Sequence, residues 1–195
     1  RAKKPIIVVP NHLVAQWGKE FMELYPNANI LVPTKQDFSA KRRKMLMARV
    51  ATGDYDSIII GHSQLTKIAN DPEFEIGFIK RQIDTVQKSI DAIREAEGQK
   101  SRTVKNAEKI KDALEDRLNE LNSLEKDDNL NITELGIDAL FVDEAHEFKN
   151  LQYSTGMQRV AGLGNPVGSK KAFDLFIKTQ GILERTGGNN VTFLT

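Results

Sequence analysis

Residues 140–150 read LFVDEAHEFKN, an apolar run followed at once by a cluster of charge. The run begins at Ala139 and ends at Val142, which is the length and character of a strand buried on both faces of a parallel sheet. The polar residues that follow it are Asp143, Glu144, His146 and Glu147. In an open α/β sheet, ligands bind beyond the carboxyl ends of the strands. The stretch therefore predicts a buried strand with a polar site at its tip.

Strands alternate with helices over most of the chain. Further strand-like apolar runs are residues 5–9, 29–32, 57–60 and 191–194. Apolar residues at helical spacing predict helices at 12–25, 39–52 and 171–184. Their expected apolar positions are Leu13, Trp17, Phe21 and Leu24, then Met45, Leu46, Ala48 and Val50, then Phe173, Phe176, Ile177 and Leu183. This alternation predicts a three-layer α/β fold built on a parallel sheet.

Residues 76–126 break the alternation. Isoleucine and valine recur there at spacings of four, three, four and three, which is a heptad seam, at Ile79, Ile83, Val86, Ile90 and Ile93. Residues 98–101 read as a turn. The seam continues through Val104, Ala107, Ile110 or Lys111, Leu114, Leu118 or Arg117, Leu121 and Leu124. We expect an antiparallel helical hairpin inserted into an α/β domain that comprises 1–75 and 127–195.

Composition excludes several classes of protein. Hydrophobic residues make up 39% and charged residues 28% of the 195 residues, which suits a globular core. The formal net charge of +1 provides no global basic field for nucleic acid, so any such site must be a local patch. Cysteine is absent, which excludes disulfides and thiolate metal sites. Without a signal peptide or a long apolar run, a cytoplasmic protein is expected. The strand-like run at each end suggests a piece of a longer polypeptide.

The acidic cluster suits metal and water chemistry. Asp143 follows the strand directly, and a carboxylate there can hold Mg²⁺ through water beside nucleotide phosphates. Glu144 points differently from its neighbour and is placed to orient or deprotonate an attacking water. His146 can hydrogen-bond to a neighbouring loop. The alternative is that these residues only cap the strand and begin a helix.

The motifs around this cluster resemble those of a known family. VDEAH, residues 142–146, resembles motif II of the DEAH-type superfamily 2 helicases and translocases, and the longer DEAHEFKN resembles the version in the Swi/Snf-like translocases. IIVVPNHLVAQWGKEF, residues 6–21, is similar to motif Ia of that family. YDSIIIGHSQL, residues 55–65, resembles motif Ib, and VTFLT, residues 191–195, resembles the strand that leads into motif III.

The resemblance implies the first RecA-like domain of a motor that couples ATP hydrolysis to movement along DNA. Asp143 would bind Mg²⁺, Glu144 would contact the nucleotide and act as general base, and His146 would couple the ATP site to the DNA site. The implied cofactors are ATP and Mg²⁺. The implied partners are duplex DNA, contacted through its backbone, and a second RecA-like domain of the same polypeptide.

The chain departs from the family pattern in two places. Gly61, His62 and Ser63 stand where motif Ib usually has threonine and tyrosine. The P-loop string G-x-x-x-x-G-K-[ST] is missing, and the glycine-rich stretch at 162–170 has the wrong spacing and reads as a loop. The 195-residue chain by itself should therefore not hydrolyse ATP at a useful rate.

Motifs Ia and Ib imply a track for the phosphates of one nucleic-acid strand. The residues expected to line it are Pro10, Asn11, His12, Gln16, His62, Ser63 and Gln64. Both histidines could equally be ordinary structural residues, and Trp17 fits core packing better. The basic run at 41–44 could contact phosphates, but a solvated helix face is the more common role of such a run.

Two other functions stay open at this point. The motor could serve a restriction or nuclease system whose cutting site lies elsewhere. The motor fold could also be a relic in a non-catalytic scaffold that works through the helical hairpin, although a relic has no chemical need for both Asp143 and Glu144.

Overall fold

The computed structural model describes residues 2–97, 102–123, 130–149, 151 and 169–195. They divide into two compact units, which are described separately. The sheet unit takes its residues from Arg1–Asp71, Asp128–Glu147 and Asp174–Thr195, and the hairpin unit takes its residues from Pro72–Asp127 and Phe148–Phe173. The predicted turn at 98–101, Leu124, Asn150 and the glycine-rich segment 162–168 lie outside the described residues.

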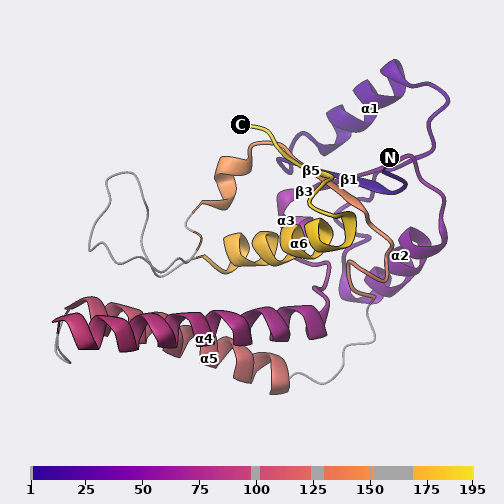
Figure 1. Ribbon diagram of the computed structural model, residues 1–195. Helices are drawn as coiled ribbons and strands as arrows, with labels where there is room; N and C mark the ends of the chain where they lie inside the picture. The colour runs from indigo at the N-terminus through magenta and orange to yellow at the C-terminus, as the bar shows by residue number, and fades with distance from the viewer. Residues whose placement is uncertain (1, 98–101, 124–129, 150, 152–168) are drawn as a thin grey trace. The chain divides into compact units, whose positions relative to one another are not determined.

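The sheet unit is built on a parallel sheet, which the described residues form with five strands (Figure 1). The strands are β1 (Pro5–Val9), β2 (Ile30–Leu31), β3 (Ser57–Gly61), β4 (Ala139–Val142) and β5 (Val191–Phe193). Their spatial order is β2-β3-β1-β4-β5, and every neighbouring pair is parallel. This confirms the predicted strands and the α/β, RecA-like fold class.

The core lies on the three central strands. Ile59 of β3, Val8 of β1 and Leu140 of β4 are fully buried. Burying one such side chain contributes about 1.5–3 kcal/mol, so these continuous apolar runs stabilise the centre of the sheet. The edge strands are shorter, and Phe193 on β5 is 50% exposed.

Helices cover both faces of the sheet. In Figure 1, α1 (Val14–Leu24) lies on one face, and α2 (Ala40–Thr52) and α6 (Lys170–Thr186) lie on the other. The connection from β1 to β2 crosses the sheet in one direction, and the later connections cross it in the other. Because such crossovers are right-handed, the helices fall on opposite faces, which gives the predicted three layers.

The predicted buried face of α1 is only partly confirmed, because Leu13, Trp17 and Phe21 are half-buried whereas Leu24 is exposed. Gly18 is the buried residue of this helix, and a β-carbon built on it would lie 3.0 Å from Cγ2 of Val32. The closest approach of α1 to Val32 is thus made by a glycine between the half-buried members of the stripe. Leu24, at the end of the helix, is 75% exposed, and Trp17 is half-buried rather than fully packed in the core.

The other helices show similar rotations. In α2, Leu46, Met47 and Val50 are buried, whereas Met45 is 77% exposed and Ala48 is exposed, contrary to the prediction. The two methionines are equally apolar, so only packing decides between them. In α6, Ile177 is buried as predicted, whereas Phe176 and Leu183 are half-buried.

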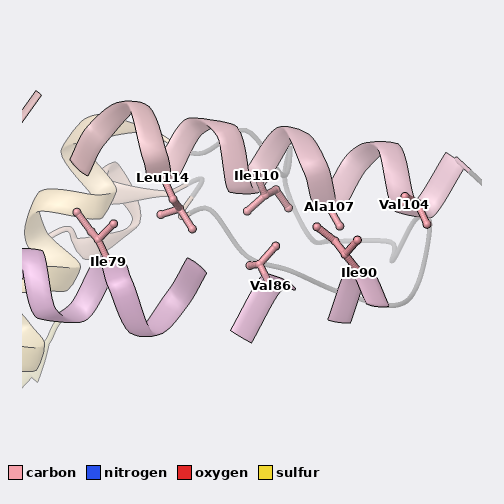
Figure 2. Packing of buried hydrophobic residues seen from close by; sticks show 7 residues of the cluster. All are labelled: Ile79, Val86, Ile90, Val104, Ala107, Ile110 and Leu114. Carbon is pink, nitrogen blue, oxygen red and sulfur yellow. The ribbon is translucent and has the colours of Figure 1, made fainter. Parts of the chain in front are cut away.

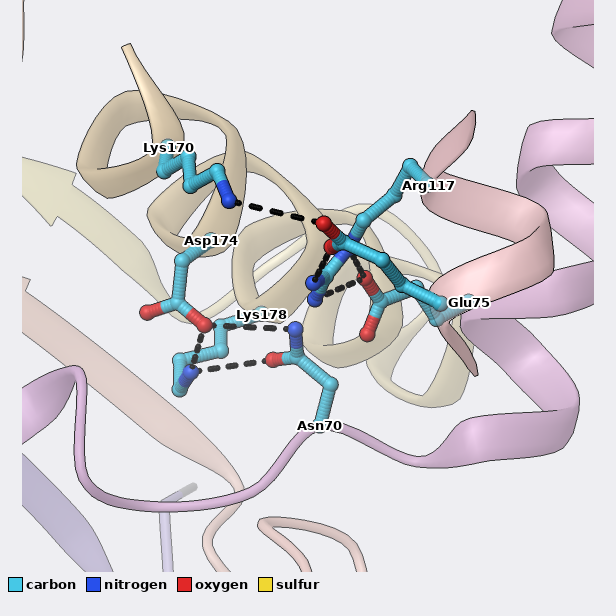
Figure 3. Close-up of polar contacts among 7 residues, drawn as sticks. Asn70, Glu75, Arg117, Lys170, Asp174 and Lys178 are labelled. Atoms are coloured by element: carbon cyan, nitrogen blue, oxygen red, sulfur yellow. Dashed lines mark hydrogen bonds and ion pairs between the residues drawn. The ribbon is translucent and has the colours of Figure 1, made fainter. Parts of the chain in front are cut away.

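A buried lysine anchors α6 within the sheet unit. The side chain of Lys178 is fully buried, and its Nζ lies 2.5 Å from Oδ1 of Asp174 and 2.9 Å from Oδ1 of Asn70 (Figure 3). A buried charge is tolerated only when it is paired in this way. The group therefore joins α6 to the segment that follows α3 (His62–Leu65).

The hairpin unit contains the predicted helices, α4 (Pro72–Glu97) and α5 (Arg102–Ser123). One buried cluster joins them, namely Ile79, Val86, Ile90, Val104, Ala107, Ile110 and Leu114 (Figure 2). Ile83, Ile93, Leu118, Leu121 and Phe173 pack against it as partly buried residues. The predicted seam is confirmed for the described residues, with Ile110 and Leu118 in place of Lys111 and Arg117.

Ion pairs at opposite ends of the hairpin show that its helices are antiparallel. Arg94 Nη2 lies 2.7 Å from Glu108 Oε1. At the other end, Arg117 Nη2 lies 3.0 Å from Glu75 Oε1 (Figure 3). Glu75 is 3% exposed, so Arg117 supplies a charge that this buried carboxylate needs. Burial lowers the pKa of Arg117, but the Glu75 and Glu120 carboxylates outweigh it and raise that pKa overall.

None of the described helices is long and apolar enough to cross a membrane.

Replacing Ile90 with alanine tests the hairpin core. Ile90 is 1% exposed, and its truncation leaves a cavity between α4 and α5. We expect Ile90→Ala to lower the free energy of unfolding of the hairpin by about 2–5 kcal/mol, measured by urea denaturation with circular dichroism at 222 nm. Lys88→Ala, on the exposed side of α4, is the control and should change it by less than about 0.5 kcal/mol. Equal effects of both changes would contradict the seam.

Candidate functional site

The register of the sheet brings three loops to one edge. Val8 of β1 pairs with Ile60 of β3 and with Val142 of β4, so these strands end at the same level. The residues that follow them are therefore neighbours, although they are far apart in sequence. The polar groups at this edge come from the β1–α1 loop, from the start of α3 and from the β4 tip.

Asn11 and Ser63 connect the first two loops. Oδ1 of Asn11 accepts hydrogen bonds from the backbone N–H of Ser63 at 3.1 Å and from the Ser63 hydroxyl at 2.9 Å. Both residues are exposed, so this junction faces solvent.

A glycine permits this junction. A β-carbon on Gly61 would lie 2.3 Å from Oδ1 of Asn11 and 3.2 Å from its Cα. The backbone N–H of Gly61 donates to Oε1 of Gln64 at 2.6 Å, and Nε2 of Gln64 faces the carbonyl of Pro33 at 3.5 Å. The side chain of Gln64 therefore stabilises the start of α3 from the inside.

His62 connects the second loop to the acidic tip of β4. Its Nε2 lies 2.8 Å from the carbonyl oxygen of Asp143, and the residue is 5% exposed. A carbonyl oxygen only accepts hydrogen bonds, so Nε2 carries the proton and donates. The bond joins residues 81 positions apart.

Glu144 has a strained backbone. Its φ is +51°, in the left-handed region that residues other than glycine rarely adopt, at a cost of about 1–2 kcal/mol. Asp143 donates its backbone N–H to the carbonyl of Val8 at 2.8 Å, and Ala145 donates its own to the carbonyl of Leu194 at 2.9 Å. Strands on both sides of β4 thus hold the backbone that flanks Glu144. Strain of this kind concentrates at functional sites.

His146 lies beside the carboxylates of its own turn. It belongs to a short 3-10 helix, η1 (Ala145–Phe148), which follows β4. Its Nδ1 is 3.1 Å from Oε2 of Glu144, and its Nε2 is 3.7 Å from Oε1 of Glu147. Both contacts are local, whereas His62 makes the hydrogen bond between this strand tip and a neighbouring loop.

The residues predicted to line a nucleic-acid track fall into two groups. Asn11, His12, Gln16 and Ser63 are exposed at this edge or on the first turns of α1, and Pro10 is half-buried. The side chains of His62 and Gln64 are buried and turned inward. The one sequence signal for the burial of His62 and Gln64 is that they follow directly on the unbroken apolar run of β3.

The donor set suits a lightly held Mg²⁺. Among the described residues, no three histidine, aspartate or glutamate side chains converge on one point. Mg²⁺ is commonly held by one or two carboxylates together with water and substrate phosphates, so a single half-buried Asp143 at the strand tip fits this mode.

A parallel α/β sheet with adjacent acids at a strand tip and a polar edge shared by three loops is typical of nucleotide-dependent enzymes. A family model described as a probable helicase domain matches residues 1–195, so the chain belongs to that family. No curated protein and no solved structure matches it.

Gly61→Ala tests the close approach of two loops. The added methyl group would collide with Asn11, and overpacking of this kind costs about 1–3 kcal/mol. We expect a lower midpoint of thermal unfolding than in the unmodified chain. Gly77→Ala is the control, because a β-carbon there meets only the Arg81 Nη1 at 3.6 Å, and alanine favours a helix over glycine. A Gly61→Ala chain as stable as the unmodified one would disprove the close contact.

Proposed function

We propose that this helicase-family chain is the first RecA-like domain of a DEAH-box, Swi/Snf-like motor that couples ATP hydrolysis to movement along DNA. The observation that best supports this is the Asp143–Glu144 pair at the carboxyl end of β4, with Glu144 held in a strained conformation by neighbouring strands. Strain that is maintained by specific hydrogen bonds is more readily explained by a catalytic requirement than by capping alone.

The side chains have separate roles in this proposal. Asp143 would hold Mg²⁺ through water, and the metal would neutralise charge on the phosphoryl group of ATP. Glu144 would orient the attacking water and accept its proton. His146, at 3.1 Å from Glu144, would keep that carboxylate in one orientation. The phosphate-binding loop and the second RecA-like domain would come from other parts of a longer polypeptide.

The nucleic-acid contact would lie at the junction of Asn11 and Ser63. Both side chains are exposed, and the hydroxyl and amide groups there can donate to phosphate oxygens without reading bases. His12 and Gln16 are exposed on the adjoining part of the chain and would extend this surface.

Glu144→Gln tests the catalytic role in the full-length protein. Glutamine keeps the size of the side chain but cannot accept a proton, so we expect ATP turnover in the presence of duplex DNA to fall by about 10²–10⁴-fold. ATP binding and the melting temperature should stay unchanged. Negligible turnover in both the wild-type and the variant protein would instead favour a non-catalytic scaffold that works through the helical hairpin.

Ser63→Glu tests the nucleic-acid surface. A carboxylate next to Asn11 would repel phosphates, and we expect DNA affinity to fall about tenfold at low salt, measured by fluorescence anisotropy. Ser123→Glu on α5 adds the same charge at another exposed serine and serves as the control. Equal losses for both variants would indicate a nonspecific charge effect and count against a track at this junction.

A further inference from the structure

The buried His62 lies between the two parts of the proposed site. On one side it is covalently next to Ser63, whose N–H and hydroxyl bind Asn11 at the solvent-facing junction. On the other side its ring donates to the carbonyl oxygen of Asp143. His146 makes no such connection between loops, because its contacts with Glu144 and Glu147 stay within its own turn.

We propose that His62 is a positioning residue that makes the catalytic placement of Glu144 depend on the loop between β3 and α3. This rests on the proposed motor function. A ligand bound at Asn11 and Ser63 would then control ATP turnover through one hydrogen bond.

The geometry explains how one bond can position Glu144. The φ and ψ angles of Glu144 together set the rotation between the peptide group that precedes it and the one that follows it. His62 holds the preceding group through the Asp143 carbonyl, and Leu194 holds the following group through the N–H of Ala145. The two anchors together maintain the φ of +51°. Without His62, the preceding peptide group is free to rotate to an unstrained angle, and the carboxylate of Glu144 moves with it.

The loop between β3 and α3 is well placed to respond to a ligand bound at Ser63. The segment is short and internally braced, because Gln64 accepts from the N–H of Gly61 and α3 spans only His62–Leu65. Because Ser63 directly follows His62 in the chain, a displacement of Ser63 also moves the backbone that carries the imidazole of His62. In this proposal the Glu144 backbone has two states, the left-handed one seen here and a relaxed one, and a ligand that favours one state shifts the population.

The test uses the full-length protein with His62→Leu and His62→Gln. Leucine fills the buried space without a donor, whereas the amide of glutamine can donate from a position close to that of Nε2. We expect His62→Leu to lower kcat at saturating duplex DNA by about 10–100-fold, since small misplacements of a catalytic group have effects of this size. The KM for ATP and the Kd for DNA should change by less than about threefold, and His62→Gln should recover most of kcat.

Tyr55→Phe provides the matched control. Tyr55 lies just before β3, as His62 lies just after it, and Tyr55 is also buried, at 8% exposed. The substitution removes one hydrogen bond, which Nε of Arg49 donates to the Tyr55 hydroxyl at 2.9 Å. It should leave kcat unchanged. If His62→Leu kept the wild-type kcat, His62 would have no positioning role. If kcat and melting temperature fell, KM also changed and glutamine gave no recovery, His62 would only support the structure, which would also overturn the positioning role.

A crystal structure of the His62→Leu protein separates this inference from the proposed function. We expect the φ of Glu144 to become negative, and a φ that stays near its present value would overturn the inference irrespective of any activity. A wild-type protein without DNA-stimulated ATP turnover would overturn the proposed motor and the coupling, and the φ of Glu144 in the variant would still decide whether His62 holds it.

Discussion

The register of β1 between β3 and β4 is the constraint on which the sheet unit depends. Val8 is fully buried and pairs on one side with Ile60 and on the other with Val142. Because side chains alternate along a strand, a shift of one residue would turn buried aliphatic side chains to the other face, so the register is strongly specified. The same register brings Asn11, His62 and Asp143 to one edge.

The polar edge contrasts with this uniform core. Its hydrogen bonds join different loops, through the exposed pair Asn11 and Ser63 and through the buried His62. Glu144 follows Asp143, whose carbonyl contacts His62, and the backbone of Glu144 is strained. Strain of about 1–2 kcal/mol can be maintained at this one residue because Asp143 and Ala145, on either side of it, are hydrogen-bonded to Val8 and Leu194.

The hairpin unit is stabilised by a different pattern. Its core is a seam of apolar residues between two helices, and its charged groups lie mostly on the outside, apart from the pair between Glu75 and Arg117. The seam was predictable because a heptad repeat specifies one face of a helix. The burial of Glu75 was not predictable, since a lone glutamate in a charged helix reads as a surface residue.

The sequence by itself determined the strands, the helices and the acidic strand tip, because apolar continuity and periodicity are local properties. The motifs also predicted a helicase, and the match of residues 1–195 to a probable helicase domain supports that broader assignment. Only the tertiary structure decided which residues of α1 and α2 are buried, since Gly18 lies against Val32 and Met47 is buried whereas the equally apolar Met45 is exposed. It also decided that His62, expected to face nucleic acid, turns inward to Asp143, because hydrogen bonds between residues 81 positions apart leave no local pattern.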